Sequence, residues 1–215
     1  MKKLLLIVLL LSIGYSQNLI PVIETYNDGN IKSITYHKKT RNGIEKVKEE
    51  GYYKNGQKKS EGVIKNGDST GVWTYWYEGG QKWSERTYKD GKTVGLGTIW
   101  YETGQKMEEG IYEDGGKDSL WTFWFVNGKK KSERTYKDGK VHGKMNIWYE
   151  TGQKMIEGNF KDEKEEGIFT RWYENGKKES KGMYRNGEQE GEWTYYNKEG
   201  RIKEVKDYLR VINED

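Results

Sequence analysis

The sequence predicts an all-β protein: an elongated single-layer antiparallel sheet of tandem β-hairpins, built from about seven units of 24 residues. Glycine recurs at this step from Gly56 to Gly200, and the composition of 28 Gly, one Pro and no Ala favours turns over helices. A fixed period of this length is typical of repeat proteins. An aromatic column keeps the same step, at Trp76, Trp100, Trp124, Trp148, Trp172 and Tyr196.

Residues 1–16 have the features of a secretory signal peptide. Lys2 and Lys3 precede the apolar stretch Leu4–Ile13, and the small residues Gly14 and Ser16 stand before a cleavage site at Gln17. The apolar stretch is about half as long as the roughly 20 residues needed to cross a bilayer. We therefore expect export to the periplasm, the cell surface or the extracellular medium, with no stable membrane insertion after the signal is removed.

The chain has no cysteine, which excludes a lipid-anchored cysteine, disulfides and thiolate metal sites. Its formal net charge is +4, and loss of Lys2 and Lys3 with the signal would bring this to about +2. Charges of both signs alternate along the chain, so no basic groove for nucleic acid is expected. Nucleic acid is therefore not among the predicted partners.

Residues 17–49 are predicted to form a degenerate N-terminal cap. They contain the turn dipeptides Asp28-Gly29 and Asn42-Gly43 and the strand-like stretch Ile31–Tyr36, but the 24-residue step fails there. A row of hairpins needs such an end unit, because each repeat buries its apolar residues only against its neighbours.

Residues 50–208 are predicted to hold the hairpin repeats, followed by a charged tail at 209–215. Each unit has two glycine turns, and many of them are Asn-Gly or Asp-Gly, which accept the positive φ angles of a tight hairpin turn. Stretches such as Trp73–Tyr77 and Lys82–Tyr88 are aromatic and β-branched, as strands are. We expect local distortion where the pattern fails, namely at Gly97, Met145 and Phe169, which replace a Trp, and at Glu163, which replaces a turn glycine.

Strand alternation places Trp73 and Tyr75 on one face of the sheet and Thr74 and Trp76 on the other. Because neither face is then purely polar, either a bulge turns one column round or both faces pack against something. Both alternatives stay open at this point.

A column of glycines and arginines lies inside the second strand of each unit: Gly62, Arg86, Gly110, Arg134, Gly158 and Gly182. Glycine weakens a strand unless another group needs its space. We expect an aromatic ring over each of these glycines, and at Arg86 and Arg134 a guanidinium over the same ring.

Columns of lysine and glutamate run three residues apart through five units: Lys58, Lys82, Lys106, Lys130 and Lys154, with Glu61, Glu85, Glu109, Glu133 and Glu157. Acid and base catalysts need different environments, whereas a repeat gives these carboxylates the same one. A ladder of cross-strand ion pairs on a solvated face is the prediction. The only histidines, His37 and His142, lie some four units apart, so we expect no metal, no cofactor and no enzyme activity.

The pattern seen from Gly71 to Val94, with its paired Trp and Tyr and its Tyr-Lys-Asp-Gly-Lys turn, resembles the MORN-repeat variant family, including the bacterial YwqK-like antitoxins. The resemblance covers about residues 50–208. It implies an elongated sheet of stacked hairpins that serves as a binding surface or scaffold, without known catalytic residues.

The functional prediction is an exported, non-enzymatic scaffold that binds another protein, with an antitoxin or immunity role allowed by the resemblance. The alternative is a cell-envelope glycan-binding protein that uses exposed aromatic rows. The candidate partner-binding residues are Trp76, Trp100, Trp124, Trp148 and Trp172.

Overall fold

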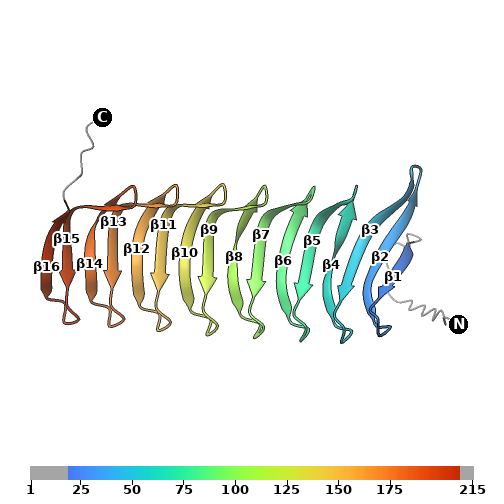
Figure 1. The fold of residues 1–215 in the computed structure, drawn as a ribbon, viewed down its shortest axis with the longest axis horizontal. Helices are drawn as coiled ribbons and strands as arrows, with labels where there is room; N and C mark the ends of the chain where they lie inside the picture. Colours follow the sequence, from blue (N-terminus) through green and yellow to red (C-terminus); the bar gives the residue numbers. More distant parts are fainter. Residues whose placement is uncertain (1–18, 209–215) are drawn as a thin grey trace.

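The computed structural model describes residues 19–208. The predicted signal peptide (1–16), the first residues of the predicted cap and the predicted tail (209–215) lie outside the described residues. Residues 19–208 form one continuous row of strands, with β1 at one end and β16 at the other (Figure 1).

All the described secondary structure is β-strand. The sixteen strands are β1 Ile20–Thr25, β2 Ile31–Thr40, β3 Gly43–Tyr52, β4 Lys58–Lys65, β5 Asp68–Trp76, β6 Lys82–Lys89, β7 Lys92–Trp100, β8 Lys106–Glu113, β9 Gly116–Trp124, β10 Lys130–Lys137, β11 Lys140–Trp148, β12 Lys154–Lys161, β13 Lys164–Trp172, β14 Lys178–Arg185, β15 Glu188–Tyr196 and β16 Ile202–Tyr208.

Each strand pairs antiparallel with the strands before and after it in the sequence, in a single open sheet. The connections are all hairpin turns, and they lie along the two long margins of the sheet (Figure 1). The predicted fold class is therefore confirmed.

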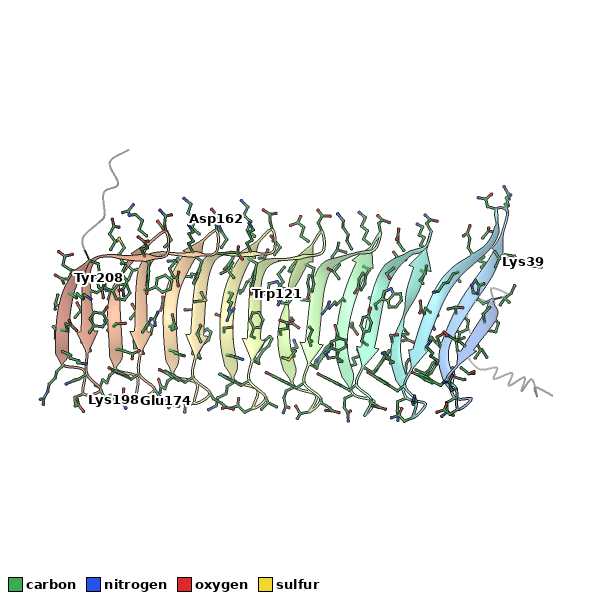
Figure 2. The ribbon with its side chains drawn as sticks, in the orientation of Figure 1. Lys39, Trp121, Asp162, Glu174, Lys198 and Tyr208 are labelled. Carbon is green, nitrogen blue, oxygen red and sulfur yellow. The ribbon has the colours of Figure 1, made fainter. Side chains whose placement is uncertain are left out.

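Tight two-residue turns occupy one margin, where Figure 2 labels Asp162. From the β4–β5 turn onward both central residues have positive φ, for example Asp90 at 49° and Gly91 at 77°, as a type I′ turn requires. The β2–β3 turn differs, because the positive φ lies at Gly43 and not at its central residues Arg41 and Asn42. The distortion expected at Glu163 is absent: Glu163 itself adopts a φ of 68° and the turn keeps its shape. Because a side chain in this region is unfavourable, Glu163 holds a strained backbone that glycine holds without strain elsewhere.

Wide turns occupy the other margin, where Figure 2 labels Glu174 and Lys198. Each is closed by two main-chain hydrogen bonds, as from Tyr77 N to Gln81 O and from Gly80 N to Tyr77 O. The tyrosine that opens the turn also bonds to the next unit: Tyr77 Oη donates to Trp100 O at 2.8 Å, and Tyr101 Oη to Trp124 O at 2.8 Å. We call these bonds tyrosine latches. Further latches start from Tyr26, Tyr53, Tyr149 and Tyr173.

A bulge next to each wide turn decides which side chains share a face. In the β5–β6 pair, Tyr75 lies opposite Ser84 and Trp76 opposite Lys82, so Trp83 is an extra residue on β6. The sequence left open whether a bulge turns one aromatic column round or whether both faces pack against something. A bulge is present, although both faces still carry aromatic side chains. We call the face with Trp73, Tyr75 and Tyr88 the indole face, and the face with Thr74, Trp76 and Glu85 the ladder face.

The core lies on the indole face, where rings lie directly on glycines of the neighbouring strand. A Cβ added to Gly110 would stand 2.4 Å from Trp121 Cδ2, and one added to Gly62 would stand 2.1 Å from Trp73 Cδ2. Phe169 and Trp193 cover Gly158 and Gly182 in the same way, which confirms the expected ring positions. Trp121 is 0% exposed although the protein has a single layer (Figure 2).

Hydrogen bonds and cations complete the burial of these rings. Trp121 Nε1 donates to Ile111 O at 2.9 Å, beside a second register shift between Glu109 and Ile111. Lys117 Nζ lies 4.0 Å from the centre of the Trp121 ring and forms an ion pair with Glu108 at 2.6 Å. A buried indole N–H needs such an acceptor, so each ring is held in one position.

In a regular unit the glycine lies on one strand and the large side chain on the next strand. In a unit with arginine, the first of these strands carries the large side chain. Where Arg86 replaces the glycine, its partner on β7 is Gly97, and the space above Gly97 is filled by Tyr112, whose Cε2 would stand 2.5 Å from an added Cβ. The Arg86 guanidinium lies 5.5 Å from the Tyr112 ring centre, so it covers a tyrosine of the next unit rather than an indole at position 97. Arg134 lies 5.5 Å from Phe123 and faces Met145. The departures at Gly97, Met145 and Phe169 are therefore compensated by their neighbours.

The N-terminal region from Leu19 to Glu49 joins the same sheet through β1, β2 and most of β3. Its first wide turn matches the others, with Tyr26 N bonded to Asn30 O and Tyr26 Oη latched to Tyr52 O. Equivalent turn tyrosines are Tyr26 and Tyr53, 27 residues apart, because β2 and β3 have ten residues each where later units have eight and nine. The failure of the 24-residue step thus reflects a longer hairpin.

Gly110→Ala is expected to lower the free energy of unfolding by about 1–3 kcal/mol, because the new Cβ collides with the Trp121 ring. Urea denaturation followed by circular dichroism measures this. The double change Gly110→Arg with Trp121→Gly copies the natural Arg86–Gly97 pair, so it should cost less than the two single changes added together. Additive effects would contradict the proposed pairing of the two positions.

Phe125 occupies a latch position without a hydroxyl group, since Phe125 N bonds to Lys129 O as the turn tyrosines do. Phe125→Tyr is therefore expected to raise the free energy of unfolding by about 0.5–1.5 kcal/mol through a new bond to Trp148 O. Tyr101→Phe removes an existing latch and should lower it by a similar amount. Equal stability of both variants and the parent protein would show that the latches contribute nothing.

Candidate partner-binding surface

The five candidate tryptophans lie in one row on the ladder face. Each ends an odd-numbered strand and stands opposite a lysine of the following strand, as Trp76 does to Lys82 and Trp100 to Lys106. A lysine from the preceding hairpin also approaches each ring, with Lys58 Nζ 5.8 Å from the Trp76 centre and Lys82 Nζ 5.7 Å from the Trp100 centre. The same contact recurs at Trp124, Trp148 and Trp172.

The five rings are half-buried, and lysine stems separate them along the row. A lysine over an aromatic ring is stabilised both by the cation and by contact of its apolar stem. The row therefore presents alternating ammonium groups and ring edges, and we call it the Trp–Lys row.

The predicted lysine–glutamate ladder exists, but its five repeated pairs lie within single strands. Cross-strand ion pairs of ladder residues occur at the N-terminal end, where Lys58 reaches Glu50 at 3.5 Å and Lys48 reaches Glu61 at 4.0 Å. Lys82 Nζ lies 2.6 Å from Glu85 Oε2, and Lys106 Nζ lies 2.6 Å from Glu109 Oε2. Residues three apart in a regular strand face opposite sides, and the bulge residue between them brings both to the ladder face. The pairs Lys58–Glu61, Lys130–Glu133 and Lys154–Glu157 repeat this arrangement.

From Glu61 to Glu157 the glutamates alternate across the sheet with threonine or asparagine, so within this stretch no two carboxylates are direct neighbours. Glu85 lies between Thr74 and Thr98, and Thr98 Oγ1 donates to Glu109 Oε2 at 3.0 Å. Each carboxylate is thus neutralised by its own lysine, which makes this row charge-balanced. Partly exposed pairs of this kind contribute at most about 1 kcal/mol each to stability.

Exposed aliphatic side chains form a further row on the ladder face, toward the tight turns. Leu96 is 57% exposed and stands directly opposite Ile111, which is 39% exposed. We call the set the aliphatic row; it comprises Val63, Val72, Leu96, Ile111, Leu120, Ile168 and Met183. Lys144 and Asn159, opposite each other on β11 and β12, interrupt it.

The aliphatic row was not among the features predicted from the sequence. Its signal is the middle position of the Gly-x-Trp pattern, where Val72, Leu96, Leu120 and Ile168 stand. Strand alternation predicts that this residue lies on the other face of the sheet from the buried ring. It does not predict that the residue is exposed.

Glu50 forms a second feature that the sequence did not reveal, at the N-terminal end of the glutamate row. It is buried, and it accepts hydrogen bonds from Lys48 Nζ at 2.7 Å, Tyr52 Oη at 2.7 Å and Tyr36 Oη at 3.1 Å. Burial alone would raise the pKa of Glu50, but the bonds from Lys48 and Tyr52 outweigh it and lower the pKa to about 2. Burial, together with the Glu50 charge, raises the pKa of Tyr36 to about 12. Both carboxylate oxygens of Glu50 therefore accept hydrogen bonds within the protein, and the cluster holds β2, β3 and β4 together.

The histidines do not approach each other in the sheet. His37 belongs to β2, and His142 on β11 lies with its Nδ1 3.4 Å from Asp162 Oδ1 beside a tight turn. Within residues 19–208, no group of three or more His, Asp or Glu side chains is arranged to hold a metal ion. The same part of the chain contains no helix long and apolar enough to cross a membrane.

These observations define a class: a repeat protein whose tandem hairpins form one open sheet with a ring-filled face and a charged, partly aliphatic face. A family model described as MORN repeat variant matches residues 69–90, 93–114, 117–138, 141–162 and 165–186, slightly more than half of the chain. The chain belongs to the MORN repeat variant family. Each matched segment comprises one wide-turn hairpin and the start of the following tight turn, as β5 and β6 do for 69–90. A comparison with curated proteins found no match.

Proposed function

We propose that this protein is an exported, non-enzymatic scaffold that binds another protein along its ladder face. The aliphatic row carries the proposal, because it leaves Leu96, Ile111 and their neighbours exposed on the same face as the Trp–Lys row. Exposed apolar side chains that gather on one face, rimmed by polar residues, mark interaction surfaces more often than scattered ones do.

The two faces differ in what they offer a partner. On the indole face the rings of Trp73, Trp121 and Trp193 lie on glycines and are almost completely buried. The ladder face repeats the same set of lysine, glutamate, tryptophan and aliphatic side chains along the row. Adjacent strands lie about 4.8 Å apart, so an extended partner meets equivalent contacts in each unit.

A binding role also fits the chemistry of the carboxylates. Glu85, Glu109 and Glu133 share one environment and one type of partner, whereas acid–base catalysis requires groups with contrasting environments. The resemblance of the repeats to YwqK-like antitoxins makes a toxin a candidate partner, with this protein in an immunity role.

Glycan binding is the alternative function. The feature that favours it is Trp83 on the indole face, which is 40% exposed and lies 6.0 Å from Tyr75 and 6.4 Å from Tyr77, centre to centre. A sugar ring stacks on exposed aromatic faces of this kind. The aromatic cluster is a single one, however, because Met107 and Lys131 take the place of Trp83 in the next two units.

Leu96→Glu with Ile111→Glu is expected to abolish capture of the partner protein while leaving the circular dichroism spectrum and unfolding midpoint almost unchanged, since both side chains are exposed. The measurement is affinity capture, from extracts of cells that express the protein, of a single partner that is identified and then titrated in purified form. Trp83→Ser is the matched control on the other face and should bind normally. If instead Trp83→Ser alone abolishes a fluorescence response to envelope polysaccharide fragments, the glycan function replaces this proposal.

Export predicts a mature chain that begins at Gln17, after removal of residues 1–16. Intact-mass measurement of the protein recovered from the expressing cells checks this. A chain that keeps Lys2 and Lys3 and stays in the cytoplasm would contradict export without affecting the binding proposal.

A further inference from the structure

Two strands of the sheet are paired on one side only. They are β1 and β16, at opposite ends of the row (Figure 1). The free side of such an edge strand presents unpaired main-chain N–H and C=O groups, which can pair with a strand of another molecule. The side chains of the two edge strands decide whether such pairing is favoured.

β1 is poorly suited to pairing with a further strand. It contains Pro21, which has no main-chain N–H, and a proline on an edge strand hinders the addition of another strand. β16 contains no proline, and its side chains from Ile202 to Asp207 are all exposed. The free edge of β16 is therefore the one open to pairing.

β16 departs from the earlier even-numbered strands at three consecutive positions. Glu204, Val205 and Lys206 lie opposite Tyr195, Thr194 and Trp193 of β15. The equivalent residues of β6 are Ser84, Glu85 and Arg86. Ser84, in the middle of the sheet, is only 1% exposed, whereas Glu204 is exposed. A strand added to β16 must therefore supply opposite charges to both Glu204 and Lys206.

These charges have no partners within their own chain. No residue of 19–208 forms an ion pair with Glu204 or Lys206, and the Lys206 ammonium group lies 4.6 Å from the centre of the Tyr208 ring. Lys203 is the bulge residue of the hairpin, so the regular part of the strand begins at Glu204. In this regular part the acidic residue precedes Val205 and the basic residue follows it.

This order of charges makes β16 complementary to a second copy of itself. A two-fold axis perpendicular to the sheet brings two β16 strands together antiparallel and keeps both indole faces on the same side. With the axis at Val205, Glu204 of each copy lies opposite Lys206 of the second copy. The two Val205 side chains, each 52% exposed in a single chain, meet on the ladder face. Opposite charges and β-branched residues in such cross-strand positions stabilise a sheet.

Other registers between two β16 strands are unfavourable. An axis at Glu204 would place two carboxylates opposite each other, and an axis at Lys206 would do the same with two ammonium groups. Like charges directly opposite each other destabilise a sheet. An axis between two residues would place a ladder-face side chain opposite an indole-face one, which strand alternation does not permit.

Head-to-tail pairing of β16 with β1 of a second copy is also unfavourable. Continuing the repeat in this way would place Glu204 opposite Glu24, because the two residues hold the positions of Ser84 and Ile99 in the β6–β7 pair. Pro21 would lie in the same contact. The favoured occupant of the β16 edge is therefore a second β16.

We propose that β16 is a dimerisation edge, through which two copies of the chain pair antiparallel about a two-fold axis at Val205. The dimer is one continuous sheet of two sixteen-stranded halves, with both ladder faces on the same side. Because each copy contributes a single strand to the contact, the dimer should form and dissociate with protein concentration. This inference is independent of the scaffold function.

The first test is sedimentation velocity of residues 17–215 over a wide range of protein concentration. The parent chain should change from monomer to dimer and form no larger species, because a two-fold contact is closed. Lys206→Glu should raise the dissociation constant at least about tenfold, since each Glu204 then faces a second carboxylate. Lys89→Glu makes the same charge change at an exposed position on β6 and should dimerise as the parent does.

Charge exchange separates a loss of pairing from a loss of folding. The double variant Glu204→Lys with Lys206→Glu should dimerise again, because it reverses both members of the pair. An equimolar mixture of the single variants Glu204→Lys and Lys206→Glu should form a heterodimer, although neither variant dimerises alone. Circular dichroism should show the same β spectrum for every variant.

Disulfide formation tests the position of the axis, since the chain has no cysteine of its own. Residues directly opposite in an antiparallel pair have Cα atoms about 4.5–5.5 Å apart, within the roughly 4.4–6.8 Å that a disulfide spans. Val205→Cys should therefore give a covalent dimer in oxidised glutathione. Val22→Cys is the matched control on β1, since Val22 is 54% exposed, and it should stay monomeric.

A chain that stays monomeric at every concentration would overturn the inference. So would species larger than a dimer, equal cross-linking of Val205→Cys and Val22→Cys, or a dimer that Lys206→Glu leaves unchanged. A variant that ends at Tyr208 should dimerise as residues 17–215 do. Loss of the dimer in that variant would assign the contact to residues 209–215 and not to β16.

Discussion

The close approach of an aromatic ring to a glycine on the neighbouring strand is the contact on which this structure depends. A single-layer sheet has no second layer to cover its apolar side chains, so each ring must find its cover within the sheet itself. Trp121 does so by lying flat on Gly110 while Lys117 covers its other side. Removal of the Cβ at one position thus permits the burial of an indole at another, and the pairing is repeated wherever a large ring occupies that column.

The constraint also explains why units differ without disturbing the sheet. When arginine takes the glycine position, as at Arg86, the partner position becomes Gly97 and the ring comes from Tyr112. The larger side chain at position 86 is therefore offset by the loss of the side chain at position 97 on the adjacent strand. Arg134 and Met145 make a similar exchange two units later. Both arrangements, a glycine beneath a ring and an arginine beside a smaller residue, involve adjacent strands. Neighbouring hairpins are therefore coupled and cannot be replaced independently of each other.

Much of this architecture could be predicted from the sequence, because periodicity and glycine turns are strong local signals. The 24-residue step predicted tandem hairpins, and the glycine column predicted rings at Gly62 and Gly110. The sequence could not reveal the phase of the bulge at Trp83, which places Lys82 and Glu85 on one face and turns expected cross-strand pairs into pairs within a strand. Nor could it show that Glu163 would adopt a positive φ, because that depends on the rest of the hairpin overriding a local preference.

The candidate site was predicted less completely. The 24-residue step places the five tryptophans at equivalent strand positions, and the structure aligns them in one row. Their partial burial beneath lysine stems depends on side-chain positions that the spacing does not determine. The exposure of the aliphatic row could not be predicted, because Leu96 and Ile111 are ordinary strand residues in a protein where both faces carry aromatic rings. What distinguishes them is the absence of a covering layer over residues 19–208, which is a property of the whole sheet.

The placement of the two chain ends in the described sheet has a mechanical consequence. Leu19 precedes the strand at one extremity and Tyr208 ends the strand at the other, so tension applied between them runs across the strands. Antiparallel hydrogen bonds then open pair by pair in a peeling geometry and do not resist together in shear. We therefore expect the sheet to unfold under tension in steps of one hairpin. Each hairpin should refold when the tension is released, because it forms from adjacent segments of the chain.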